Sequence, residues 1–224
     1  MQIRLILQAR LNSSRLPGKV LLPVGGLPLV VLCARRAMTC GYPLVAVTSD
    51  QASDDPLVSV LDEHGIAYER GDLDDVLSRF VMASRDMDDS DLVVRLTGDN
   101  PCVDGDFIQD LLTFHVAHGH PYTRTLSPDD GLPYGLSAEI ITAGGLRAIA
   151  AANPTAAHKE HVTLAWTESG DYQLFKNGTG ADLSHLRVTV DTPEDYQLAC
   201  RIFEGDAAQS IATPWQTLIT RAAL

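Results

Sequence analysis

The chain has 224 residues, 45% of them hydrophobic, and a formal net charge of −12. This size suits one large α/β domain with its own core, whereas the acidic charge disfavours sequence-independent binding to nucleic acid or to an anionic membrane. The first ten residues, MQIRLILQAR, are too short and too interrupted by arginine for a signal peptide or a membrane span, and the four cysteines form no CxxC pair, so we expect a cytoplasmic protein with free thiols.

Short apolar runs alternate with amphipathic stretches along the first half of the chain. This alternation is typical of a βαβ series with a parallel sheet. The expected strands lie at 3–8, 43–48, 66–70 and 91–97. The expected helices lie at 28–40, 54–64, 73–85 and 104–118.

From residue 120 to 142 the pattern changes to a turn-rich sequence with three prolines and two glycines. We interpret this segment as a small β-rich insertion or edge hairpin. Its apolar residues Tyr122, Leu126 and Leu132 have no obvious partner in the main sheet, so we expect them to form the contact surface of a homodimer.

The rest of the chain predicts helices at 144–152 and 157–168, strands at 171–176 and 186–190, and a helix that starts after Thr192. Thr192 as N-cap, Pro193 at the first helical position and two acidic residues in the first turn are typical of a helix start. This places Asp191 at the carboxyl end of the strand expected at 186–190. No repeat or linker divides the chain, which indicates one domain over residues 1–224.

A basic segment, QARLNSSRLPGKVL at residues 8–21, follows the first expected strand and carries Arg10, Arg15 and Lys19. Ligands of open parallel sheets bind beyond the carboxyl ends of the strands, and two guanidinium groups with an ammonium can hold a triphosphate. The segment is neither a P-loop nor a GxGxxG loop. It predicts an anion-binding site, with an ordinary surface loop as the alternative.

The basic segment belongs to a wider charge asymmetry, because the first 49 residues hold six basic side chains and no acidic one. A small positive region on an acidic protein favours a site for a compact polyanion. The alternative is random clustering, with Arg35 and Arg36 on a solvated helix face.

Two aspartates, Asp99 in TGDNPCVD and Asp191 in VDTPED, follow other expected strands and should open into the same crevice. Two carboxylates with phosphate oxygens and water make the usual octahedral environment of Mg²⁺. The alternative is that each aspartate only caps the helix that follows it.

The segment LQARLNSSRLPGKVL at 7–21 resembles the N-terminal signature of the cytidylyltransferases that activate 3-deoxy-manno-octulosonate and neuraminate. The whole chain is similar to the spore-coat polysaccharide biosynthesis protein F family within that superfamily. The further matching blocks are ERGDLDDVLSRF, VVRLTGDNPCVD, YGLSAEI, HKEHVTL and LRVTVDTPEDYQL. Cys102 and Lys159 depart from the family's usual residues, but neither is an expected phosphate or metal ligand.

The resemblance implies a Rossmann-like α/β nucleotidyltransferase fold and a site for CTP and Mg²⁺. Its implied catalytic residues are Lys19, Arg10 and Arg15, and its implied metal ligands are Asp99 and Asp191. The implied nucleotide-binding residues are Gln8, Ala9, Arg10, Ser14, Arg15, Lys19, Arg70, Gly71, Arg79 and Gly98. The implied acceptor-binding residues are Tyr134, Glu139, Glu160 and His161, although His161 and Glu139 also suit packing and ion-pair roles.

The function that follows is a magnesium-dependent cytidylyltransferase that couples CTP to a small acidic sugar or a phosphate- or phosphonate-bearing acceptor, with release of pyrophosphate. One alternative is a nucleotide-sugar-dependent glycosyltransferase, for which Asp104-Gly105-Asp106 has the spelling of a metal-binding DxD motif, although its place at a helix start favours a cap. Another is a catalytically idle nucleotide-binding subunit, which would be expected to have lost at least one charged ligand. The expected partners are CTP and a small anionic acceptor.

Overall fold

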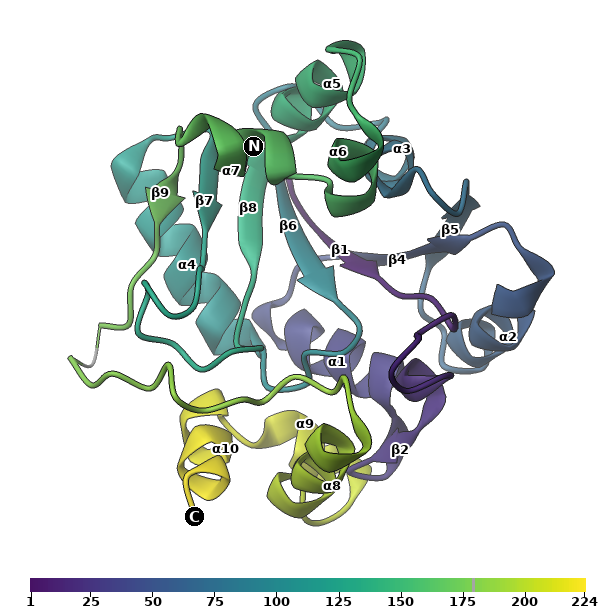
Figure 1. Ribbon diagram of the computed structural model, residues 1–224, viewed down its shortest axis with the longest axis vertical. Coiled ribbons are helices and arrows are strands. Elements are labelled where there is room, and N and C mark those ends of the chain that lie inside the picture. Colours follow the sequence, from purple (N-terminus) through teal and green to yellow (C-terminus); the bar gives the residue numbers. More distant parts are fainter. Residues whose placement is uncertain (179) are drawn as a thin grey trace.

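The computed structural model describes residues 1–178 and 180–224. Its centre is a seven-stranded sheet (Figure 1) whose strands follow one another across the sheet in the order β5 (Tyr68–Gly71), β4 (Leu44–Ser49), β1 (Ile3–Gln8), β6 (Leu92–Thr97), β8 (Glu139–Thr142), β7 (Tyr122–Arg124) and β9 (Gln173–Leu174). All neighbouring pairs are parallel except β6 with β8 and β8 with β7. The expected α/β fold with a mostly parallel central sheet is confirmed.

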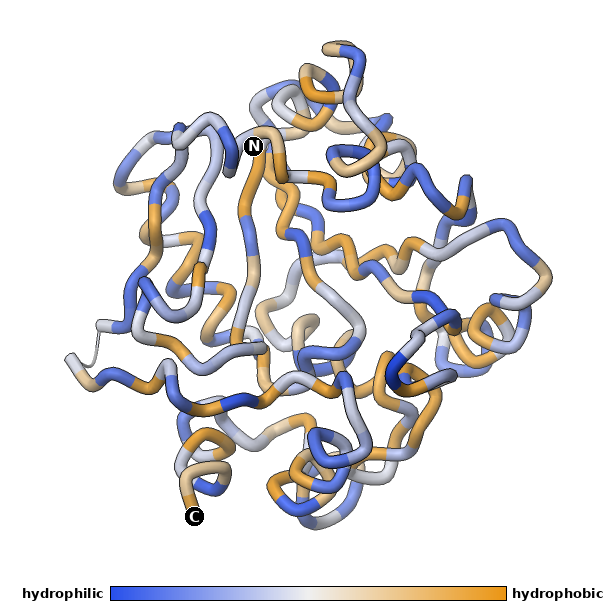
Figure 2. The backbone as a smooth tube through the Cα atoms, in the orientation of Figure 1, coloured by the Kyte–Doolittle hydropathy of each residue, from blue (hydrophilic) through white to orange (hydrophobic). Residues whose placement is uncertain are grey.

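Helices cover both faces of this sheet. One face packs against α1 (Leu29–Ala37), α2 (Asp55–Glu63) and α4 (Gly105–His118), and the other against α3 (Val76–Ala83) and α5 (Ala143–Ala151). Successive strand residues point to opposite faces, so Leu5 and Leu7 lie in the first of these cores and Ile6 in the second. The central strands are hydrophobic along most of their length, whereas the loop after β1 is largely hydrophilic (Figure 2).

The remaining elements are short. They are the 3-10 helices η1 (Lys19–Leu21), η2 (Met38–Cys40) and η3 (Ala52–Asp54), the hairpin of β2 (Pro23–Val24) and β3 (Leu27–Pro28), and the helices α6 (Ala156–His161), α7 (Leu164–Ser169), α8 (Pro193–Ile202), α9 (Ala207–Ala212) and α10 (Trp215–Ala222). Among the described residues, no helix has both the length and the apolar character needed to cross a membrane.

The eight elements predicted up to residue 118 are all present, with ends within three residues of those expected. Local signals explain this agreement. Asp75 caps α3 by accepting a hydrogen bond from the backbone of Ser78, and Asp104 caps α4 in the same way through Phe107. The start of α8 is also as predicted, since Thr192 and Asp195 form a reciprocal capping box.

The segment 120–142 forms an antiparallel pair of strands in the outer part of the central sheet, in agreement with the edge-hairpin interpretation. It supplies β7 and β8, and β8 pairs with β6 from Leu92 opposite Thr142 to Arg95 opposite Glu139. Tyr122 and Leu132 are buried within their own chain. The homodimer stays a prediction, but these apolar residues no longer support it.

Two further predictions are wrong in part. The helix expected at 157–168 is divided into α6 and α7 by Val162, whose backbone has φ 53° and ψ −61°. The strand expected at 186–190 is an extended segment with one isolated bridge, Tyr134 to Arg187, and the strand at 171–176 is reduced to β9. The backbone of Val190 nevertheless donates to Asp99 O (2.9 Å), which brings Asp191 beside the loop after β6.

Arg36 does not lie on a solvated helix face, because its side chain is 0% exposed. The guanidinium of this α1 residue donates to backbone carbonyls of two distant segments, Pro101 and Cys102 on one side and residues 210–213 on the other. It also pairs with Asp104 at 3.4 Å. Arg36 is therefore a structural cation that joins α1 to the C-terminal helices, not part of an anion site.

Candidate active site

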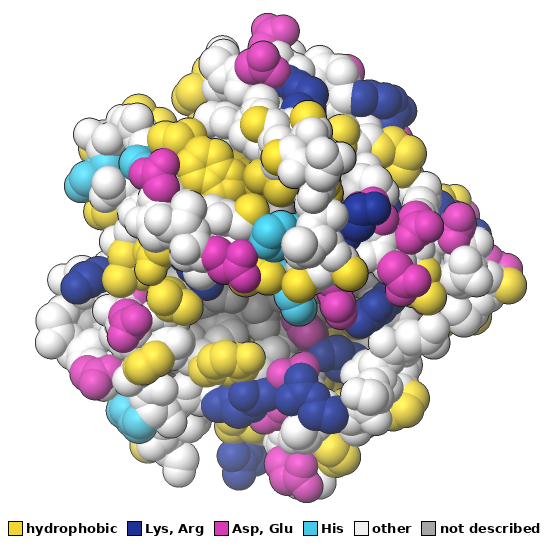
Figure 3. Space-filling view, turned by 45° about the horizontal axis from the view of Figure 1, so that its top comes forward, with side chains coloured by type: hydrophobic (Ala, Val, Ile, Leu, Met, Phe, Trp, Pro, Cys, Tyr) yellow, Lys and Arg dark blue, Asp and Glu magenta, His cyan; other side chains and the backbone are white. Residues whose placement is uncertain are grey.

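The loops that follow β1 and β6 enclose a cleft of about 320 Å³ beyond the carboxyl ends of these parallel strands, where open α/β sheets bind their ligands. In the space-filling view, basic and acidic side chains gather beside a hollow in the surface (Figure 3). The cleft is lined by Gln8, Ala9, Arg10, Asn12, Ser13, Ser14, Arg15, Lys19, Val20, Val76, Arg79, Thr97, Gly98, Asp99, Glu160, His161 and Asp191.

Most of the site residues predicted from the sequence meet in this cleft. They come from five separate parts of the chain, which the fold brings together. They are Gln8, Ala9, Arg10, Ser14, Arg15 and Lys19 from the N-terminal segment, Arg79 from α3, Gly98 and Asp99 after β6, Glu160 and His161 at the end of α6, and Asp191 before α8.

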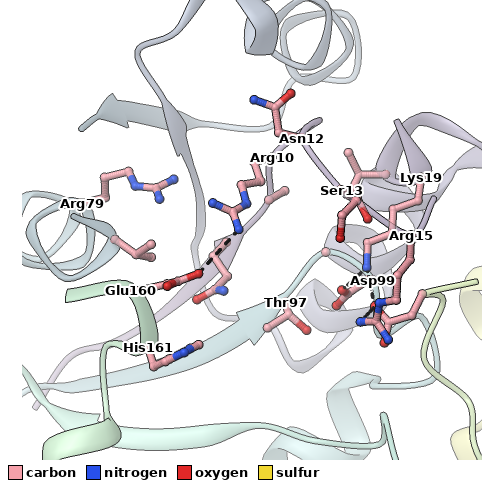
Figure 4. A pocket seen from close by; sticks show the side chains of 17 residues that line it. Arg10, Asn12, Ser13, Arg15, Lys19, Arg79, Thr97, Asp99, Glu160 and His161 are labelled. Atoms are coloured by element: carbon pink, nitrogen blue, oxygen red, sulfur yellow. Dashed lines mark hydrogen bonds and ion pairs between the residues drawn. The ribbon is translucent and has the colours of Figure 1, made fainter. Parts of the chain in front are cut away.

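Lys19 lies at the centre of one end of the cleft (Figure 4). Its Nζ is 2.6 Å from Asp99 Oδ2 and 2.7 Å from Asp191 Oδ1. Gly18, with φ 69°, turns the chain into η1 and so directs Lys19 inward. Burial of the ammonium opposes its charge, but the two carboxylates outweigh burial and raise the pKa of Lys19.

Asp191 is surrounded by cations. Arg15 Nη2 lies 3.0 Å from its Oδ1, and Arg187 Nη2 lies 2.7 Å from its Oδ2. Burial opposes the ionised form, yet the hydrogen bond and charge of Lys19, followed by the charges of the two arginines, lower the pKa of Asp191. The carboxylate is therefore ionised at neutral pH and holds three cationic side chains around it.

Neither Asp99 nor Asp191 is a helix cap. The side chain of Thr192 caps α8, and that of Asp104 caps α4. The helix-cap alternative is therefore wrong for both aspartates. Among the described residues, no group of three or more His, Cys, Asp and Glu side chains gathers as a ready metal centre.

The other end of the cleft carries Arg10, Glu160, His161 and Arg79 (Figure 4). Arg10 Nη2 and Glu160 Oε1 form a long ion pair of 3.8 Å between the N-terminal loop and α6. Arg79 is buried, and burial followed by the charge of Arg10 lowers its pKa. Its Nη2 donates to Leu73 O at 3.3 Å, whereas its Nε has no partner among the described residues. The Arg79 side chain also lines the cleft.

Arg70 and Gly71, predicted to bind nucleotide, do not line the cleft. Arg70 donates to the carbonyls of Ser49 and Gln51 and pairs with Asp55 at 2.8 Å. Gly71 lies behind Arg79, and a Cβ atom there would come within 2.9 Å of the Arg79 Cγ.

Two predicted acceptor ligands also lie outside the cleft. Tyr134 is 49% exposed and stacks on Arg187, whose guanidinium carbon is 4.7 Å from the ring centroid. Glu139 pairs with Arg95 at 2.6 Å within the sheet. Both therefore contact residues next to the site instead of facing into the cleft.

The DxD spelling at residues 104–106 has a structural explanation. Asp104 caps α4, accepts a hydrogen bond from the backbone of Trp215 at 2.7 Å and pairs with buried Arg36. Burial is the main cause of the raised pKa of Asp104. This carboxylate is committed to the fold and does not line the cleft.

Five lining residues were not predicted from the sequence, namely Asn12, Ser13, Val20, Val76 and Thr97. Four of them are neighbours of predicted residues, so extending each motif by one or two positions would have found them. Val76 lies three residues before the predicted Arg79 on α3, so helical spacing places both on one face.

Comparison with known proteins agrees with this architecture. The model of a family described as cytidylyltransferase matches residues 5–199. The spore coat polysaccharide biosynthesis protein SpsF of Bacillus subtilis is 31% identical over 98% of this chain and 94% of its own length.

Solved structures share the fold. A cytidylyltransferase from Leptospira borgpetersenii has a TM-score of 0.80 and 24% identity over 94% of this chain and 92% of its own. A CMP:2-keto-3-deoxy-manno-octonic acid synthetase complexed with CTP has a TM-score of 0.63 and 16% identity, covering 88% and 96%. The match of the family model along most of the sequence, together with the identity to SpsF, shows that the chain belongs to the cytidylyltransferase family.

Proposed function

We propose that the protein transfers the cytidylyl group of CTP to a small anionic acceptor, an acidic sugar or a phosphate- or phosphonate-bearing compound, and releases pyrophosphate. The observation that carries this proposal is the convergence of Arg10, Arg15 and Lys19 with Asp99 and Asp191 at one strand-end cleft. The family membership and the relative named for polysaccharide biosynthesis support it.

The reaction is an in-line displacement. An acceptor oxygen forms a bond to the α-phosphorus of CTP, the bond from that phosphorus to the bridging oxygen breaks, and pyrophosphate leaves with the electron pair. A hydroxyl acceptor would lose its proton in this step, whereas a carboxylate or phosphate oxygen has none to lose. Lys19 and Arg15 would donate to the phosphate oxygens on which negative charge develops, so positioning and charge neutralisation supply the catalysis.

The donor set at Asp99 and Asp191 fits a divalent metal ion, for which we propose Mg²⁺. Two carboxylate oxygens already converge on one cation, the Lys19 ammonium, and oxygen donors are those that Mg²⁺ prefers. A bound Mg²⁺ would neutralise phosphate charge and orient the α-phosphate. Lys19 would then leave the carboxylates and donate to the phosphates.

The nucleotide base and ribose belong near α3 in this proposal. Arg79 is buried there with an Nε that has no partner among the described residues, and a carbonyl-bearing pyrimidine would satisfy it.

A location in the cytoplasm is supported by Cys33, Cys40, Cys102 and Cys200, which are free thiols.

Pyrophosphate release with each of the four ribonucleoside triphosphates, against sugar acids, sugar phosphates and phosphonates, tests the proposal. We expect turnover with CTP and one class of acceptor, and loss of turnover on removal of divalent metal by a chelator. Release with a purine triphosphate alone would contradict the assignment to CTP. No release with any pair, from protein that is folded by circular dichroism, would contradict the transferase activity itself.

A further inference from the structure

A half-buried ion pair beside the cleft has no role in the proposed reaction. Arg95 on β6 and Glu139 on β8 face each other across an antiparallel pair of strands. Their Nη1 and Oε1 atoms are 2.6 Å apart, and the two side chains are 14% and 16% exposed. Neither residue lines the cleft. Burying two charges is costly unless further contacts stabilise them.

Glu139 anchors the loop between α6 and α7. Its Oε2 accepts hydrogen bonds from the Tyr122 hydroxyl at 2.8 Å and from the Thr163 hydroxyl at 2.5 Å. Burial opposes the charge of Glu139, but Arg95 and these hydroxyl groups lower its pKa. The carboxylate is ionised and holds Thr163 against the sheet.

Thr163 completes an unusual turn that ends α6. Its backbone nitrogen donates to His161 O at 2.5 Å, and Val162 between them has φ 53° and ψ −61°. This is a γ-turn with a positive central φ, a strained form that is exceptional for a β-branched residue. Val162 is fully buried. The two residues before it, Glu160 and His161, line the cleft.

Arg95 contacts a residue that lines a second part of the cleft. Its Nε donates to Gln8 Oε1 at 3.2 Å, and Gln8 lines the cleft. Since arginine can only donate hydrogen bonds, the carboxamide oxygen of Gln8 must face Arg95. The amide NH₂ is then left to donate to a ligand.

We propose that the Arg95–Glu139 pair is a positioning device that sets both the orientation of His161, through Thr163 and the strained turn at Val162, and the donor face of Gln8. This inference rests on the proposed function, because His161 and Gln8 would contact the acceptor and the nucleotide. Glu139 is then a positioning residue and not an acceptor ligand.

Thr163→Val tests the part of the proposal that concerns His161. Valine keeps the β-branched shape but removes the hydroxyl that ties the turn to Glu139. Thr163→Ser restores the hydroxyl, and Thr123→Val is a matched control, because it removes a buried threonine hydroxyl (2.8 Å from His115 Nδ1) that does not contact this network. We expect the His161 ring signal in the ¹H–¹³C NMR spectrum of ligand-free protein to shift or broaden in Thr163→Val only.

Kinetic measurements add a second test of the part that concerns His161. With the acceptor found in the pyrophosphate assay, Thr163→Val should raise the acceptor KM roughly tenfold while kcat and the KM for CTP change less than about twofold. Thr163→Ser and Thr123→Val should keep all three near wild type. Equal behaviour of Thr163→Val and Thr123→Val in both readouts would overturn the proposal.

Arg95→Lys tests the part of the proposal that concerns Gln8. Lysine can still neutralise Glu139 but has no second nitrogen to hold Gln8. CTP affinity measured by calorimetry should fall about fivefold or more. The His161 signal should shift less than in Thr163→Val, because Thr163 loses its long contact to Arg95 Nη1 (3.3 Å) but keeps its hydrogen bond to Glu139. Unchanged CTP affinity would contradict the proposal that Arg95 orients Gln8. If wild-type protein bound no CTP, the proposed function would fail instead, and the His161 signal would still decide whether the turn is held as proposed.

Discussion

Lys19 joins the anion-binding and carboxylate parts of the site, because its ammonium contacts both Asp99 and Asp191. Removing one transition-state donor commonly lowers turnover by roughly 100- to 1000-fold. We expect Lys19→Ala to do so in the pyrophosphate-release assay. Arg15→Ala should chiefly weaken binding of CTP, and that of CMP less, because Arg15 would contact the distal phosphates. Wild-type turnover in folded Lys19→Ala would contradict the role assigned to Lys19.

The two aspartates should act as one unit. Asp99→Asn and Asp191→Asn each remove one of the two charges on which a shared metal ion would depend. We expect either substitution to cripple metal-dependent turnover, and the double variant to be little worse than the worse single one, since groups that act together are not additive. Asp86→Asn, which loses only an exposed ion pair with Arg4, is the control. Near-normal turnover in either site variant would rule out a shared metal.

The Lys19–Asp191 contact also predicts a pH dependence of stability. The pKa of Asp191 lies below its ordinary 3.8, so its contribution is complete above that pH and is lost as pH falls through the lowered value. The pKa of Lys19 lies above 10.5, so its contribution is complete below that pH and is lost as pH rises further. The difference in free energy of unfolding between wild type and Lys19→Met, from urea titrations, should therefore be constant from about pH 5 to 9 and shrink outside that range. A difference that varied steadily across the plateau would contradict this pairing.

At the scale of elements, the segment 186–190 positions Asp191, and Gly135 packs closely against this segment. Gly135 has φ 99°, and a Cβ atom there would lie 2.4 Å from Thr189 N. We expect Gly135→Ala to displace this segment and lower both the melting temperature and turnover. Gly131→Ala is the matched control, because Gly131 also has a positive φ (68°) but its nearest neighbour would be 3.7 Å away. Equal effects of the two substitutions would mean that backbone strain alone matters and not the contact with Thr189.

Sequence patterns predicted elements whose signals are local. The capped helices and the strands of the parallel half were predicted because their caps and apolar periods lie within a few residues. The place of β8 between β6 and β7 was not, since strand pairing depends on distant partners. Nor was the division at Val162, because neither glycine nor proline marks it and packing holds the strained backbone.

The candidate site shows the same contrast. Their charge and their place at expected strand ends predicted Lys19, Asp99 and Asp191, which the fold does bring into contact. Motif resemblance selected the same three residues. It also selected Glu139, whose side chain is instead directed to Arg95 and Thr163. A motif identifies a strand residue that matters, but the face to which its side chain points depends on register.

At the scale of the whole molecule, the homodimer remains a prediction without the apolar surface first suggested for it. Sedimentation at micromolar concentration measures it directly. We expect a mass of twice the 24.2 kDa chain. A mass of one chain across the concentration range would contradict the homodimer.

Arg36 has a consequence for how the protein is made. The hydrogen bonds of its guanidinium are complete only when residues 210–213, some 174 positions later in the sequence, supply their carbonyl oxygens. During synthesis α1 emerges early, whereas the acceptors of its buried cation leave the ribosome only some 174 residues later. Until then, burial of that charge lacks much of its compensation. We therefore expect the core layer around α1 to be complete only after residues 210–213 have left the ribosome.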